Sequence, residues 1–322
     1  MRSVGRQRMS FFIFVLLSVV LAGLIKGSVD VPLGELFHPE NRPLLSLRLF
    51  RVLAGIVAGS GLAACGIALQ AILRNPLAEP YLLGTSSGAG LGAVLAVILG
   101  IGQAFLPLSA FIGALVSAVL VYSIARQGYR IPIPSLILSG VVVSVAFSGI
   151  IVFLISVSSN EAVHGLMWWL WGSLDVYDPR LLSAVSLVVL AGIAVLFVFA
   201  QDLNALSLGE EEAHHLGVQT ERVKTGLFIL TSLMTACLVC VTGIIGFVGL
   251  IVPHLMRMVV GPNHKTLLPA SCLAGASFLV GCDLIGRTVF SPVEIPIGVI
   301  TAVVGAPVFI VLMKMQHRVR ER

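Results

Sequence analysis

Ten apolar stretches divide this chain, and they constrain its fold more than any other feature. Most approach the roughly 20 residues that a helix needs to cross a bilayer. Because a backbone in lipid must satisfy its own N–H and C=O groups, stretches of this kind fold as helices. We expect an all-α, polytopic membrane protein with about ten transmembrane helices. Their expected ranges are 9–25, 51–73, 82–100, 105–125, 135–156, 181–200, 223–243, 247–260, 267–285 and 295–313.

The eighth stretch, 247–260, is shorter than a full crossing and contains Pro253 and His254. We interpret it as a half-span that its neighbours shield from lipid, since irregular backbone at membrane depth must be buried in protein.

Composition supports a single transmembrane domain over residues 1–322. Only 11% of the residues are charged and 57% are hydrophobic, whereas soluble domains carry about 25% charged residues. The longest polar stretch, 201–224, is too short to form a core of its own. Arginines before the first apolar stretch resemble a signal peptide. We interpret that stretch as a retained span, because it is long and Ile25-Lys26-Gly27 is a poor cleavage site; a cleaved signal is the alternative.

The distribution of Lys and Arg predicts the orientation. With the N-terminus in the cytoplasm, 14 of the 20 basic residues fall on the inner side and 6 on the outer side, as the positive-inside rule requires. Both termini, the segment 75–84 and the segment 201–224 are then cytoplasmic. The net charge of +5 follows from this topology and does not indicate nucleic-acid binding.

Segment 75–84 is unusually shaped for a turn between two spans. It contains Pro76, Glu79 and Pro80, and it ends at Gly84. Gly84, Gly88 and Gly92 then recur every fourth residue, which gives the next helix a face for close packing. We expect a polar connection at the membrane surface that leads into a tightly packed helix.

Two sources of energy for transport would each require particular residues in the sequence. A phosphate-binding P-loop needs Gly before its Lys, and none of the four lysines follows a glycine. This chain is therefore not an ATPase of that type. An ion-coupled carrier needs titratable groups at mid-membrane depth, and these are scarce. Asp283 and Arg287 have the i, i+4 spacing of a structural ion pair. A self-contained secondary carrier or channel remains the alternative function.

No metal site, bound cofactor or catalytic set is predicted. The five cysteines lie in apolar stretches, and Cys237 and Cys240 are interpreted as small residues on one helix face, with a redox or metal pair as the alternative. His214 and His215 are a weak metal candidate, because adjacent residues of a helix point apart. A membrane-embedded enzyme is a third possibility, but no nucleophile, base and metal ligands converge in the sequence.

Polar groups at the two membrane surfaces suggest partners. Arg48, Arg51 and Arg287 occur on the side where basic residues are depleted, so we expect a docking surface for an acidic partner. Headgroup anchoring is the alternative for any one of them. On the inner side, Gly209 and Gly217 bracket an acidic short-helix pattern, which predicts a rigid knob for a cytoplasmic partner. The loop 157–180 holds Trp168, Trp169, Trp171 and Tyr177, typical of an interfacial belt.

Four stretches, in this order, resemble the FecCD family of ABC-importer permeases. They are Asn-Pro-Leu-Ala-Glu-Pro-Tyr-Leu-Leu-Gly at 75–84, Leu-Gly through Leu-Gly-Val at 208–218, Gly-Phe-Val-Gly-Leu-Ile-Val-Pro-His-Leu-Met-Arg at 246–257, and Glu-Ile-Pro-Ile-Gly-Val through Gly-Ala-Pro-Val-Phe at 294–309. The resemblance covers residues 48 to 315 and implies the type II ABC importer architecture, with ten helices in each permease.

The resemblance also implies partners and cargo. A second permease subunit, identical or paralogous, shares the pathway. Two cytoplasmic ABC ATPase subunits hold ATP and Mg, and a periplasmic or lipid-anchored binding protein delivers a ferric siderophore, haem or cobalamin. The chain would sit among the lipids of the inner (plasma) membrane of a bacterium, bind no cofactor itself and contact no nucleic acid. The sequence does not choose among the substrates.

Residue roles carried over from the family are expectations of the same kind. The ATPase-coupling element would comprise Leu208, Gly209, Glu210, Glu211, Glu212, Ala213, Leu216 and Gly217. Arg48, Arg51 and Arg287 would receive acidic residues of the binding protein. The family usually reads Arg-Leu-Pro-Arg here, and Phe50 replaces that proline, which changes the expected aim of Arg48 and Arg51. The fifth and tenth helices would line the pathway, with Ser139, Ser144 and Ser148 as candidates.

Overall fold

The structure is a computed structural model that describes residues 2–29, 31–32, 34–35, 38–158, 160–176 and 178–320. In these ranges the chain is helical and has no β-strand, which confirms the all-α prediction. The α-helices are α1 (Arg2–Ile25), α2 (Arg42–Ile72), α3 (Thr85–Ile98), α4 (Leu106–Ala125), α5 (Ile133–Ser156), α6 (Asn160–Leu170), α7 (Pro179–Val198), α8 (Ala200–Leu208), α9 (Glu210–His215), α10 (Thr220–Thr242), α11 (Val248–Val260), α12 (His264–Thr288) and α13 (Ile297–Arg320). Short 3₁₀ turns occur at η1 (Pro39–Asn41), η2 (Pro80–Leu83) and η3 (Gln103–Phe105).

Each of the ten predicted spans corresponds to one apolar helix. Seven helices of the described chain are long and apolar enough to cross a membrane, namely α1, α2, α4, α5, α7, α10 and α12. Three shorter ones, α3, α11 and the part of α13 up to Val311, complete the set. The half-length of the eighth span is confirmed by α11, although its helix continues through Pro253 instead of breaking there.

Several predicted ranges differ from the helices, and the differences at α3 and α2 have structural reasons. The stretch expected at 82–100 is helical only from Thr85 to Ile98, because η2 and the left-handed Gly84 (φ 74°) precede it. The stretch expected from residue 51 begins at Arg42, so α2 has 31 residues and a length of about 46 Å at 1.5 Å per residue. Hydropathy alone therefore overestimated α3 and missed the first turns of α2, which contain Arg42 and Arg48.

Two short helices, α6 and α8, were not predicted, whereas α9 was. The expected aromatic loop contains α6, which includes Trp168 and ends just before Trp171. The two rings meet edge to face, with their centroids 5.9 Å apart. Both rings are exposed, as an interfacial belt requires, whereas Tyr177 lies outside the described residues. The polar segment 201–224 contains most of α8 before the predicted helix α9, and α8 packs on α2 and α12.

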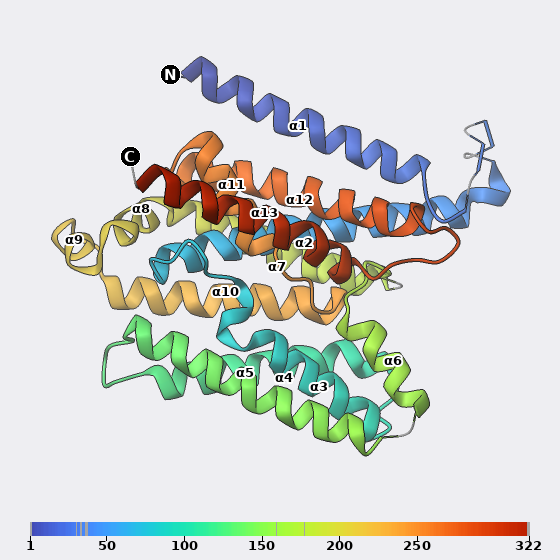
Figure 1. Ribbon diagram of the computed structural model, residues 1–322, viewed down its shortest axis with the longest axis horizontal. Helices are drawn as coiled ribbons and strands as arrows, with labels where there is room; N and C mark the ends of the chain where they lie inside the picture. The colour runs from blue at the N-terminus through green and yellow to red at the C-terminus, as the bar shows by residue number, and fades with distance from the viewer. Residues whose placement is uncertain are drawn as a thin grey trace.

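Helix α2 is the centre of the bundle, with α7, α10, α11 and α12 packed around it (Figure 1). Glycines allow the closest approaches. A Cβ at Gly59 would overlap the carbonyl of Gly275 in α12, and a Cβ at Gly66 would overlap that of Gly249 in α11. In the second tight pair, α3 with α4, a Cβ at Gly88 would overlap the carbonyl of Gly113. These contacts confirm that the glycine faces serve close helix packing.

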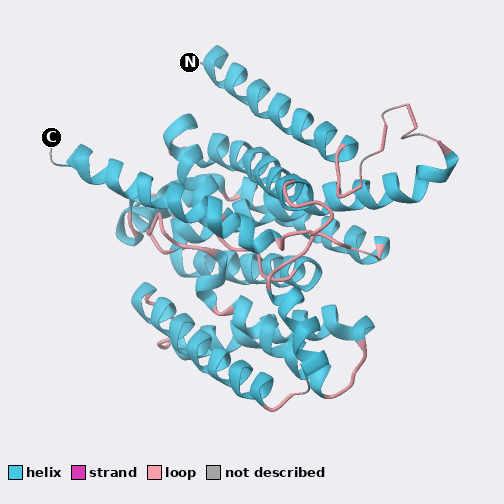
Figure 2. Cartoon of the chain, turned by 45° about the vertical axis from the view of Figure 1, so that its right-hand side comes forward, coloured by secondary structure: helices cyan, strands magenta, loops and turns pink. Residues whose placement is uncertain are grey.

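Both ends of the chain lie at the end of the bundle where α9 is found (Figure 1). The opposite end carries α6 and η1. Helix α1 lies on the outside of the bundle and packs mainly on α12 (Figures 1 and 2). The Arg8 side chain near its start donates to the carbonyl of Val259 at the end of α11. We call the end with α9 the α9 end; that it faces the cytoplasm remains a prediction from the basic residues.

Candidate coupling and docking sites

Helix α9 is a short rigid projection held between two glycines. Gly209, just before the helix, has φ 150° and ψ 158°, a conformation open essentially only to glycine. At the other end Gly217 adopts φ 85°. Its N–H donates to the carbonyl of His214 at 2.9 Å, and the N–H of Val218 donates to that of Ala213 at 3.0 Å. This pair of bonds is a Schellman motif, and it confirms the predicted helix between glycines.

The side chains of the predicted coupling segment divide into anchoring and exposed groups. Ala213 is fully buried, which fixes α9 to the bundle. Leu208 and Leu216, at the two ends of α9, are 68% and 66% exposed. Exposed leucines beside acidic residues are suited to contact with another protein. The coupling role itself stays a prediction.

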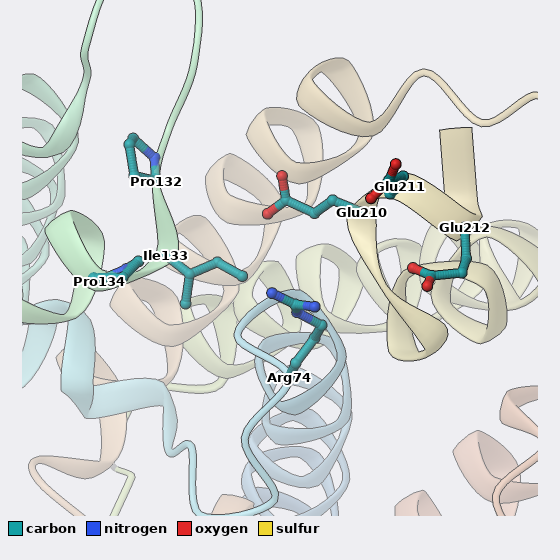
Figure 3. A pocket seen from close by; sticks show the side chains of 7 residues that line it. All are labelled: Arg74, Pro132, Ile133, Pro134, Glu210, Glu211 and Glu212. Atoms are coloured by element: carbon teal, nitrogen blue, oxygen red, sulfur yellow. The ribbon is translucent and has the colours of Figure 1, made fainter. Parts of the chain in front are cut away.

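The three consecutive glutamates of α9 differ in their surroundings. Glu210 is half-exposed and forms an ion pair of 3.0 Å with Lys224 in α10. The side chain of Glu212 folds back toward Gly209. A Cβ atom at position 209 would overlap the Glu212 carboxylate. Glu211 is exposed. All three line a cavity of about 470 Å³ whose other wall is Arg74 and residues 132–134 (Figure 3).

The predicted docking arginines are held inside the chain. Arg48 is 3% exposed, and its guanidinium donates to the carbonyls of Ile25 and Val29 at 2.6 Å. Arg287 is 2% exposed; it pairs with Asp283 at 3.0 Å and donates to the carbonyl of Gly23 at 2.6 Å. The predicted i, i+4 ion pair is thus confirmed. Both arginines are buried in this conformation, and their docking role stays a prediction.

Arg51 is the most connected of the three. It contacts Asp175 at 2.9 Å, Asp283 at 3.0 Å and Glu294 at 2.7 Å. Helix α2 continues through Phe50 without a kink, so Arg48 and Arg51 are i, i+3 neighbours on one helix surface. Both side chains accordingly turn toward internal partners. Their docking role remains a prediction. It would require the two arginines to leave these internal partners for acidic residues of the binding protein.

The structure separates the three candidate pathway serines of α5. Ser139 is buried within the chain, Ser144 is half-buried and Ser148 is exposed. Residues nine positions apart lie on opposite sides of a helix with 3.6 residues per turn. Ser139 therefore lies on the face of α5 that packs inward, and its pathway role stays a prediction. For Ser144 and Ser148 the pathway role stays a prediction too.

The segment 75–84 is not confined to a membrane surface. Ser117 in α4 donates to the carbonyl of Gly84 at 2.7 Å, and the carbonyl of Leu82 touches Gly140 in α5. Ser117 is eight residues from the last residue of α4, Ala125, which corresponds to about 12 Å of helix. The segment thus returns into the bundle from the α9 end, which corrects the expected surface turn.

The sequence did not predict the tertiary hydrogen bonds of this segment. The carboxylate of Glu79 accepts the backbone N–H of Phe247 at 2.6 Å, and the hydroxyl of Tyr81 accepts that of Ile245 at 3.1 Å. Both donors belong to the non-helical residues between α10 and α11, and Phe247 has a φ of 70°. A carboxylate between two prolines was the signal in the sequence that such a partner existed.

Metal and thiol chemistry find little support in the described residues. No group of three or more His, Cys, Asp or Glu side chains there is arranged to hold a metal ion. The rings of His214 and His215 are 6.5 Å apart. All five cysteines are free thiols, and Cys240 donates to the carbonyl of Cys237 within its own helix.

Comparisons with known proteins agree with the motifs. The model of the FecCD transport family matches residues 13–315. The cobalamin import system permease BtuC of Halobacterium salinarum is 42% identical over 86% of this chain and 75% of its own. The hemin transport system permease HmuU of Yersinia pestis is 32% identical over 98% and 97%.

A solved structure shares the architecture as well. A transporter assigned to the metal-chelate ABC type, in an inward-facing conformation, superimposes with a TM-score of 0.88 at 33% identity, covering 96% of this chain and 99% of that one. Family, relatives and fold coincide over nearly the whole length. The chain therefore belongs to the FecCD transport family.

Proposed function

We propose that this chain is the permease subunit of a binding-protein-dependent ABC importer that moves a bulky chelate across the inner (plasma) membrane of a bacterium. The cargo class is cobalamin, haem or a ferric siderophore. The first two are the cargoes that the names of its relatives state. The chain is not itself an enzyme, and ATP and Mg bind to separate ATPase subunits.

The observation that carries the proposal is the presentation of α9. A six-residue helix is clamped at both ends by glycine conformations and anchored by one buried alanine. Leu208 and Leu216, which flank it, and its Glu211 and Glu212 are exposed to solvent. A separate protein at the α9 end, moving α9 as a rigid body, fits this geometry. We assign that role to the ATPase.

The remaining partners follow from the same proposal. A second permease, identical or paralogous, would complete the pathway beside α5, whose Val142, Val145 and Val152 are exposed. A periplasmic or lipid-anchored binding protein would deliver the cargo at the end that carries α6 and η1. Lipids cover the apolar outer surface.

The test is reconstitution of the permease with its ATPase and binding protein in proteoliposomes. Cyanocobalamin, hemin and a ferric hydroxamate are offered separately, and uptake and ATP hydrolysis are measured together. We expect one of them to be taken up only when ATP is present on the ATPase side and to stimulate hydrolysis. Uptake by the permease alone, driven by a proton or sodium gradient, would instead establish a secondary carrier.

A further inference from the structure

The first turn of α10 contains a buried cation, Lys224, which is only 3% exposed. Its ammonium group lies 3.0 Å from Glu210 in α9 and 2.6 Å from Glu221 in its own helix. It also donates to the carbonyl of Ile131 at 3.2 Å. One ammonium group thus joins α9, α10 and the segment that leads into α5. We call Glu210, Lys224, Glu221 and Ile131 the Lys224 junction.

The junction holds Ile131 by both of its backbone polar groups. While its carbonyl accepts from Lys224, its N–H donates to Glu221 at 3.0 Å. Pro132 and Pro134 follow at once, and α5 begins between them at Ile133. Each proline fixes its own φ and restricts the residue before it. A displacement of Ile131 is therefore passed to the first turn of α5 rather than absorbed by a flexible loop.

Open space separates α9 from the start of α5 beside this connection. A cavity of about 470 Å³ lies between α9 and residues 132–134. Figure 3 shows Glu210 extending from α9 toward Ile133 across this space, which Glu211 and Glu212 also line. Because a buried ammonium group depends on its carboxylate partners, the ion pair between Glu210 and Lys224 is the tie across the cavity.

We propose that Lys224 is a positioning residue that transmits displacement of α9 to α5. The inference rests on the proposed function, because it takes α9 to be moved by an ATPase. Farther along α5, Gly140 touches the carbonyl of Leu82, so α5 in turn contacts the segment that re-enters the bundle. The Lys224 junction is the first step of this route.

The first experiment measures the ratio of cargo uptake to ATP hydrolysis in the reconstituted complex. Lys224→Met should lower this ratio at least fivefold while hydrolysis continues, and Lys224→Arg should restore part of it. Arg222→Met is the matched control, since Arg222 lies on the same turn, is exposed and donates to Gln219. Its ratio should stay within twofold of wild type. An unchanged ratio in Lys224→Met overturns the proposal.

A second variant guards against misfolding. Glu210→Gln removes a half-exposed charge and leaves Lys224 paired with Glu221, so the complex should assemble normally. We expect the ratio to fall in the same direction as for Lys224→Met. A wild-type ratio in this variant, confirmed as assembled by size-exclusion chromatography, contradicts the role of the tie.

A third measurement does not depend on transport. Spin labels at exposed positions, introduced through His215→Cys in α9 and Tyr129→Cys before α5, report the distance between the two elements in the assembled complex. Lys224→Met should broaden or shift that distance distribution, and Arg222→Met should not. An unchanged distribution overturns the proposal. If the distance responds but the wild-type complex shows no ATP-dependent uptake, the proposed function fails while the mechanical link stands.

Discussion

The carboxylate of Glu79 accepts the backbone N–H of Phe247 at 2.6 Å, although 168 residues separate them in the chain. This contact ties the re-entrant segment 75–84 to the non-helical residues that precede α11. Pro80 packs against Gly249 in the first turn of the same helix. Two irregular segments at membrane depth thus satisfy each other's polar groups, which is the condition for irregular backbone in a bilayer.

Removing the acceptor group of Glu79 or of Tyr81 should destabilise the contact between these two segments. Tyr81→Phe removes only the hydroxyl that accepts from Ile245, and a buried donor left unsatisfied costs about 1–3 kcal/mol. We expect a lower thermal midpoint of the purified protein in detergent. Tyr129→Phe is the control, because Tyr129 is 93% exposed. Equal midpoints for the two variants would show that the Tyr81 hydroxyl contributes nothing.

Glycine substitutions should separate packing from helix propensity. Gly59→Ala places a methyl group against the carbonyl of Gly275, and overpacking of this kind costs about 1–3 kcal/mol. Gly226→Ala meets no atom within 4 Å and should stabilise α10 by about 0.5–1 kcal/mol. Thermal unfolding of both variants checks the opposite signs. A Gly59→Ala protein as stable as wild type would mean that α2 and α12 can move apart freely.

The outer arginines should matter even without a binding protein. Arg287→Met leaves Asp283 with a single cationic partner, Arg51, and breaking a buried ion pair costs about 3–5 kcal/mol. We expect the thermal midpoint of the isolated permease to fall markedly. Arg180→Met is the control, since Arg180 is exposed near the start of α7. If only binding-protein affinity changed, Arg287 would be a docking residue and not a structural one.

The C-terminal clamp of α9 should be needed for coupling. Gly217→Pro demands φ near −65° where the structure has 85°, and it removes the N–H that donates to His214. We expect ATP hydrolysis to continue with little cargo uptake. Gly217→Asn, which tolerates the left-handed conformation, should retain most uptake. Normal uptake by Gly217→Pro would remove the geometry of α9 from the mechanism.

Local patterns in the sequence predicted the elements well. The apolar stretches correspond to helices, and the pattern from Gly209 to Gly217 predicted α9, because a glycine conformation ends a helix wherever it occurs. The glycines of α3 predicted close packing for a similar reason, since only a residue without a side chain permits it. The Asp283–Arg287 pair follows from helix geometry alone.

Tertiary structure decided what these elements do to one another. The spacing of Arg48, Arg51 and Arg287 could not show that their guanidinium groups turn inward. Their partners include groups in other segments of the chain, as far as 264 residues away for Arg287 and Gly23. The depth of the segment 75–84 and the Lys224 junction depend likewise on how separate helices pack. Backbone conformation and hydropathy are local properties, so sequence patterns were enough to predict the apolar helices and the family. Charge pairing across the bundle is set only when the helices pack together.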